Sequence, residues 1–262
     1  MDIITHTLSG VAVASVIINL KKFSFKQSAV ILGFGALGGC LPDIDVISMW
    51  SGFDGTFGQW FNLNETGRNI YTAKYWYSHH AFFHSLLASI LFTGLLATLS
   101  GLRQKITKGV ALLQGFQIGG LASFFFAYNI HLVEDMLTPS SAWGGVAYFW
   151  PSPVYIGGWG KIWWWNNYDI FGIVLILLTF NLIWRSFVKK QLLARVSAVL
   201  SFAVGVTLIS YQVNTREVDY NYSQPIEFKS LESQSLDEQK VILGDPLFNM
   251  MIKLDQKVPV HF

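Results

Sequence analysis

The stretch "GFGALGGCLPDID" (residues 33–45) sets the architecture of this chain. It lies in an apolar run at about 27–46, which is long enough for a membrane-spanning helix. Glycines at positions 33, 35, 38 and 39 allow close helix contact, so this helix is predicted to be central in a bundle. Pro42 disfavours a helical conformation at Leu41, so Asp43 and Asp45 are expected in an irregular turn. Such backbone at membrane depth is tolerated only within protein or beside a polar cavity.

The overall composition indicates a membrane protein. Of 262 residues, 52% are hydrophobic and only 13% are charged, and the mean hydropathy is +0.41, whereas soluble domains carry about 25% charged residues. The net charge of +2 is too small to favour a nucleic-acid partner. The single cysteine, Cys40, excludes an internal disulfide framework and a cysteine-rich zinc site. We expect no cleavable signal peptide, because no basic segment precedes the first apolar run.

Six apolar segments have lengths suited to crossing a bilayer. They lie at about 6–20, 27–46, 81–101, 109–134, 169–188 and 192–211. The predicted fold is an all-α membrane protein, a polytopic bundle of about six transmembrane helices. Residues 1–211 form the transmembrane domain and residues 212–262 a small extracytoplasmic C-terminal segment, with short strands expected at "KVILG" and "FNMMIKL".

The loops differ in their content of lysine and arginine. Ten of the eighteen basic residues fall in three alternate loops, "KKFSFK" (21–26), "LRQKITK" (102–108) and "RSFVKKQLLAR" (185–195). The positive-inside rule places these loops in the cytoplasm. The loops 47–80 and 135–168 are then expected outside the cytoplasmic membrane, with both termini, and "KIWWWNNY" (161–168) is expected to form an interfacial aromatic belt.

This topology brings most histidines and several aspartates to the outer end of the bundle. They are Asp2, His6, Asp43, Asp45, His79, His80, His84, His131, Asp135 and Asp169. Ionisable residues inside a membrane bundle are costly and indicate function by default. Asp169 is expected to be a helix N-cap, and Glu134 to be solvated or paired rather than catalytic.

The spacing of these residues indicates metal binding. Asp2 and His6, His80 and His84, and His131 and Asp135 are each four positions apart, which places both members of a pair on one helical face. Imidazole and carboxylate ligands suit zinc, manganese or iron, and the absence of thiolates argues against a purely structural zinc site. The number of ligands suffices for one or two divalent ions.

The ordered motifs resemble those of the YdjM-type family of membrane-bound metal-dependent hydrolases. The resemblance rests on "MDIITHTLSG" (1–10), "LPDID" (41–45), His79 with His84 and Ser85, His131 with Asp135 and Thr138, and the following Trp-Pro (150–151). It covers roughly residues 1–155. The His-x3-Asp pair is more faintly similar to that of the helical zinc phospholipases C. Spacing and resemblance together imply the metal ligands Asp2, His6, Asp43, Asp45, His79, His84, His131 and Asp135, with His80 and Thr138 in supporting positions.

The chain departs from the family pattern at two positions of the third motif. The family has arginine at the place of His80 and threonine at the place of Phe83. Helical i,i+4 spacing favours His80 as the partner of His84, whereas alignment with the family favours His79 in a loop conformation. We expect His79 to be the ligand, and the alternative stays open.

These observations predict a metal-dependent hydrolase at the outer membrane–water interface. Asp43 or Asp45 would act as general base, and the ion would activate water and polarise the scissile group. The expected substrate is a phosphoester of a phospholipid or a lipid-linked carrier, because the site lies at headgroup level.

One alternative is a metal-ion or proton-coupled transporter, disfavoured because the cytoplasmic halves of the third and fourth spans lack a titratable relay. Another is an assembly protein with a structural metal.

Overall fold

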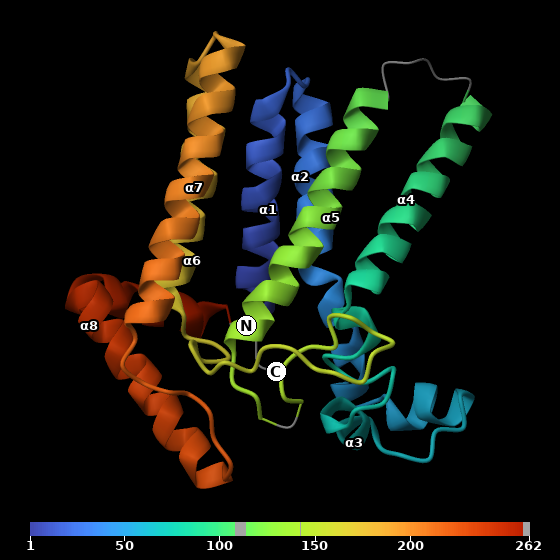
Figure 1. The fold of residues 1–262 in the computed structure, drawn as a ribbon, viewed down its shortest axis with the longest axis vertical. Helices are drawn as coiled ribbons and strands as arrows, with labels where there is room; N and C mark the ends of the chain where they lie inside the picture. The colour runs from blue at the N-terminus through green and yellow to red at the C-terminus, as the bar shows by residue number, and fades with distance from the viewer. Residues whose placement is uncertain (108–113, 142, 259–262) are drawn as a thin grey trace.

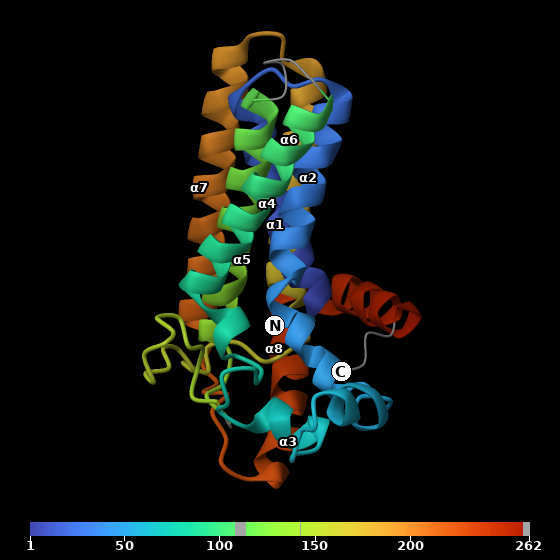
Figure 2. The same ribbon diagram turned by 90° about the vertical axis from the view of Figure 1, so that its right-hand side faces the viewer.

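Long helices form a bundle with loops and short helices gathered at one end (Figures 1 and 2). The computed structural model describes residues 1–107, 114–141 and 143–258. The long helices are α1 (Ile3–Leu20), α2 (Phe25–Cys40), α4 (Leu86–Thr107), α5 (Gln114–Leu137), α6 (Tyr168–Phe187) and α7 (Gln191–Thr215). They overlap the six predicted apolar segments, although residues 81–85 of the third segment precede α4 and residues 109–113 of the fourth lie outside the described part of the chain. Shorter elements follow α2, namely η1 (Pro42–Met49), η2 (Asp54–Gly58), α3 (Gly67–Thr72) and η3 (Phe82–His84).

Within the described residues, three helices, α1, α6 and α7, are long and apolar enough to cross a membrane. A fourth crossing is present if α2 and η1, which meet at a bend of 51°, form one span. The membrane class is therefore confirmed, and crossings by α4 and α5 stay predictions. Leu41, at the junction, keeps helical dihedrals (φ −66°, ψ −35°), contrary to the expectation from Pro42. The break is instead a change from α to 3-10 winding, so Asp43 and Asp45 lie on a tight helix rather than in an irregular turn.

The glycine-rich helix α2 packs against α1 and α5. Its predicted central position is wrong, because α1 is the helix that contacts α2, α5, α6 and α7. A Cβ atom added at Gly39 would overlap the backbone carbonyl of His6 in α1, and one at Gly38 would overlap that of Phe124 in α5. Small residues thus let three backbones approach closely. This contact brings the loop-end residues of α1, α2 and α5 together.

The short α1–α2 and α6–α7 connections lie at the end of the bundle opposite to α3 (Figure 1). Basic side chains close the end of α1 there: Arg185 donates to the carbonyls of Ile18 and Phe23, and Arg195 Nε donates to that of Leu20 at 2.6 Å. Two predicted basic loops therefore share one end. The third, 102–108, lies partly outside the described residues.

The C-terminal segment forms helix α8 (Pro225–Lys257), which is interrupted at Gly244 (φ +70°). The strands expected at "KVILG" and "FNMMIKL" are therefore wrong. Pro225 occupies the first turn, where its missing N–H costs nothing, and Glu227 accepts from the Gln224 backbone N–H in a capping box. The proline and the capping box favour the start of a helix, and this helix continues through the two segments whose residues favour strands.

Helix α8 is attached to the bundle through buried aromatic contacts and through a hydrogen bond to a buried ion pair. Trp163 is fully buried and its ring lies 4.9 Å from that of Phe228, which differs from the interfacial belt expected for this segment. Asp169 is not an N-cap, because Asn167 holds that position. The Asp169 carboxylate instead accepts two hydrogen bonds from Arg216, both at 2.9 Å, and one from Gln239 of α8 at 2.9 Å.

Candidate metal centre

Four predicted site residues from three separate elements converge at the loop end of the bundle. Asp43 lies on η1, His84 ends η3, and His131 and Asp135 lie one turn apart on α5. One ligand atom from each lies within 4.8 Å of the others. His84, His131 and Asp135 are buried, and the Asp43 side chain is 11% exposed, so the group opens toward solvent on the Asp43 side.

The distances within this group match those of a tetrahedral metal site. His84 Nε2 and His131 Nε2 are 3.3 Å apart. Asp135 Oδ2 lies 3.0 Å from His131 Nε2 and 3.3 Å from His84 Nε2, and Asp43 Oδ1 lies 3.5 and 3.6 Å from the same atoms. Ligands held at 2.0–2.1 Å by a tetrahedral zinc ion are about 3.3 Å apart. The donor set therefore has the composition and spacing of a site for a divalent ion.

The other nitrogen of each imidazole is directed at an acceptor. His131 Nδ1 donates to the Gly39 carbonyl at 2.7 Å, and His84 Nδ1 lies 3.3 Å from Asp45 Oδ2. The Gly39 contact fixes the ring orientation and the tautomer of His131 and leaves its Nε2 lone pair for a metal, whereas His84 Nδ1 and Asp45 Oδ2 approach each other without forming a hydrogen bond. Asp135 Oδ2 is buried without a hydrogen-bond partner although both Nε2 atoms are near it. A buried carboxylate oxygen beside two imidazole nitrogens is a donor arrangement that a divalent cation would fit.

His6 and Glu134 hold the other side of Asp135. His6 Nε2 lies 3.1 Å from Asp135 Oδ1, its Nδ1 lies 2.6 Å from Glu134 Oε2, and its ring stacks on His131 at 3.7 Å. The Met1 amino group also contacts Asp135 Oδ1, at 2.8 Å. Glu134 is therefore paired, and it supports the centre through His6. Because Asp135 Oδ1 is occupied in this way, only Oδ2 faces the ligand group.

Asp2, His6 and Asp45 were predicted as ligands but lie outside the two groups of ligand atoms, and Thr138 was predicted as a supporting residue. The Asp2 carboxylate caps α1 by accepting from the backbone N–H and the hydroxyl of Thr5, at 2.9 and 2.7 Å, and it is not among the grouped ligands. The Thr138 hydroxyl donates to the backbone carbonyl of Asp135 at 2.7 Å, so it supports the end of α5 rather than the carboxylate.

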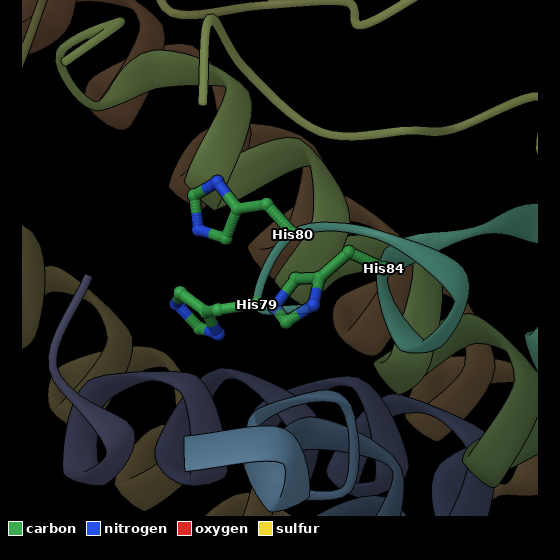
Figure 3. A group of neighbouring side chains, drawn as sticks. All are labelled: His79, His80 and His84. Carbon is green, nitrogen blue, oxygen red and sulfur yellow. The ribbon is translucent and has the colours of Figure 1, made fainter. Parts of the chain in front are cut away.

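His79 and His80 both face His84 (Figure 3). One ligand atom from each of the three histidines lies within 4.8 Å of the others, which makes a second candidate set of metal ligands. The helical i,i+4 relation expected between His80 and His84 is wrong, because residues 79–81 lie in a turn before η3. His79 Nδ1 pairs with Asp45 Oδ1 at 2.7 Å. His80 has φ +63°, and its Nδ1 donates to the Gly145 carbonyl at 3.0 Å.

Aromatic side chains that the sequence had not singled out enclose these histidines. The Tyr71 ring stacks on His79 at 4.6 Å, and the Trp143 ring lies 4.7 Å from His80. The Trp143 indole N–H donates to the backbone carbonyl of Tyr71 at 2.9 Å, which ties the two together. Their placement depends on long loops, for which the sequence contains no periodic signal.

The electrostatics differ between neighbouring histidines. Burial disfavours protonation of His84, but the charges of Asp45, Asp135 and Asp43 outweigh it and hold the pKa of His84 well above its ordinary value. Burial, followed by the charges of His79 and His84, lowers the pKa of His80 well below its ordinary value. The carboxylates therefore favour a positive charge beside them at His84, whereas His80 is neutral and able to act as a ligand.

A family model described as YdjM inner membrane protein matches residues 1–215. The matched region contains all of the grouped ligands and ends with α7, before α8. No curated protein and no solved structure matches the chain.

Proposed function

The chain belongs to the YdjM inner membrane protein family, and from this premise we propose that it is a metal-dependent hydrolase of the cytoplasmic membrane, with its site at the outer membrane–water interface. The observation that supports this proposal best is the convergence of Asp43, His84, His131 and Asp135 at pairwise distances suited to one divalent ion. Zinc fits the two-imidazole, two-carboxylate set, and manganese and iron use the same donors.

A divalent ion in this position would lower the pKa of a bound water and polarise the scissile group. His84 and His131 would hold it through Nε2, and Asp135 through Oδ2. Asp43 lies farthest from the two imidazole nitrogens and its side chain is the partly exposed one of the four, so we assign it as the ligand that gives way to water and then acts as general base. Both Asp45 oxygens face histidine nitrogens, at 2.7 and 3.3 Å, so we assign Asp45 to orienting His79 and His84.

We further propose a lipid phosphoester as the substrate. Large aromatic side chains are exposed in the loop layer beside the site, including Trp60 at 75% and Trp76 at 61%. Tryptophan is favoured at the headgroup level of a bilayer. A substrate whose polar group lies at that level could therefore reach the Asp43 side of the centre without leaving the membrane.

The test combines metal analysis with a substrate screen on purified full-length protein. We expect bound zinc, manganese or iron, and release of a phosphorylated or dephosphorylated headgroup from phospholipid or polyprenyl-phosphate vesicles. Asp43→Asn should abolish product release, and Asp245→Asn, at an exposed carboxylate of α8, should leave it unchanged. Protein with a full complement of metal that hydrolyses none of these phosphoesters would contradict the assigned substrate class.

A further inference from the structure

We propose that the centre binds a second divalent cation beside the first, with His79 and His80 as its distinguishing ligands and His84 at the edge shared by the two positions. The inference rests on the proposed function, because it takes the first ion, at Asp43, His84, His131 and Asp135, as given. A second ion makes the centre binuclear, which restricts the class of reaction that the site can catalyse.

The three histidine rings lie around a common space (Figure 3). The ring centroids of His79 and His80 are 4.3 Å apart, and His84 lies 4.8 Å from each. One ligand nitrogen from each ring lies within 4.8 Å of the other two. All three side chains are buried, so these nitrogens do not gain their hydrogen bonds from bulk water.

The backbone is bent so that two adjacent histidines share this space. Consecutive residues of a regular helix or strand point in different directions. His80 has φ +63°, a left-handed conformation that non-glycine residues seldom adopt, and this reverses the chain direction between His79 and η3. Strained backbone of this kind is concentrated at functional sites.

Each distinguishing histidine has one nitrogen fixed by the protein. His79 Nδ1 pairs with Asp45 Oδ1 at 2.7 Å, and His80 Nδ1 donates to the Gly145 carbonyl at 3.0 Å. The Nε2 atom of each ring is then the metal-binding nitrogen, in the arrangement typical of ligating histidines. Asp45 contacts both His79 and His84, so one carboxylate orients ligands of both positions.

Asp135 links the two positions. Its Oδ2 atom lies 3.0 Å from His131 Nε2 in the first group and 3.9 Å from His80 Nε2 in the second. A buried carboxylate between two cation positions balances their charge and can bridge them. Two ions about 3.5–4 Å apart can stabilise both the attacking and the leaving oxygen of an in-line displacement, which is compatible with the phosphoester substrate proposed above.

The competing interpretation is that His79 and His80 are packing residues against Tyr71 and Trp143. The number of metal ions bound per chain distinguishes the ligand interpretation from the packing interpretation, provided that the substituted chain keeps the turn at residues 79–81. His80→Asn suits this test, because asparagine tolerates positive φ and its amide can donate to the Gly145 carbonyl, but the imidazole is lost. His79→Gln serves as the second variant, and His131→Ala reports on the first position.

We would titrate metal-free, detergent-solubilised full-length protein with Mn²⁺ and record bound metal and the electron paramagnetic resonance spectrum. We expect two ions per chain and an exchange-coupled spectrum in the wild type. His80→Asn and His79→Gln should each bind one ion and give an uncoupled six-line spectrum. The unfolding temperature of each metal-free variant should equal that of the metal-free wild type.

The outcomes distinguish this inference from the proposed function. One uncoupled ion in the wild type, lost in His131→Ala, overturns the second position and leaves the first intact. Two coupled ions in His80→Asn and in His79→Gln overturn the ligand assignment. Absence of any bound metal from the wild type, with zinc as well as manganese, overturns both proposals.

Discussion

His84 Nε2 and His131 Nε2 lie 3.3 Å apart, although 47 positions separate the two residues in the chain. Each ring directs its other nitrogen at Asp45 or at the Gly39 carbonyl. The two Nε2 atoms therefore face each other beside the carboxylates of Asp43 and Asp135. Under the proposed function a divalent ion would lie between these atoms, and the following predictions depend on that arrangement.

Removing one of these imidazoles should remove the first ion. We expect His131→Ala to weaken zinc binding by more than the roughly 10- to 100-fold typical of losing an outer partner. Competition with a chromogenic chelator measures the affinity. Asp245→Asn, far from the centre on exposed α8, is the control and should bind zinc as the wild type does.

Asp45 should act on affinity without being a ligand of the first ion. Asp45→Asn keeps the size of the side chain but removes the charge that faces His79 and His84. We expect a loss of zinc affinity of about 10- to 100-fold with the first ion still retained at saturating metal. Complete loss of binding at saturation would show instead that Asp45 is a direct ligand.

The close approach of α1 and α2 should depend on Gly39. A methyl group at this position overlaps the His6 carbonyl, so Gly39→Ala must push the helices apart at the centre. We expect destabilisation of about 1–3 kcal/mol and weaker metal binding. Gly33→Ala on the same helix has open space and should be neutral or stabilising by up to about 1 kcal/mol. Thermal unfolding in detergent compares the pair.

The buried Asp169–Arg216 pair joins the start of α6 to the C-cap of α7, and Asp169 also accepts from Gln239 of α8, so loss of Arg216 should weaken the attachment of α8 indirectly. Arg216→Gln leaves Asp169 buried without its cation, at a cost of about 3–5 kcal/mol. We expect faster tryptic cleavage within α8 and a lower unfolding temperature. The exposed Lys240–Asp245 pair provides the comparison, because Lys240→Gln should cost at most about 1 kcal/mol. Equal protease resistance of wild type and Arg216→Gln would refute the docking role.

The grouping of the ligands could be predicted because hydropathy and basic loops fix helix direction. Once the loops at 21–26 and 185–195 share one end, successive helices must run in opposite directions, and Asp43, His84 and Asp135 arrive together at the other end. The role of Asp2 was also readable, since an Asp followed three positions later by Thr5 in a helix start suits an N-cap.

The local geometry could not be predicted in the same way. The turn at His79 and His80 depends on a left-handed residue, and no pattern in the sequence marks histidine for that conformation. The contact of Glu134 with His6 depends on how α1 and α5 pack, which helical spacing within either segment does not determine. For α8, by contrast, Pro225 with Glu227 and the later Gly244 were usable start and break signals.

The order of the ligands along the chain has a consequence for biogenesis. Asp43, His84 and His131 are synthesised in succession, so the centre does not exist until α5 has been made and inserted. Under the proposed function a metal ion would bind only after α5 has been inserted, so the glycine contacts between α1 and α2 would form before the ligand group is complete.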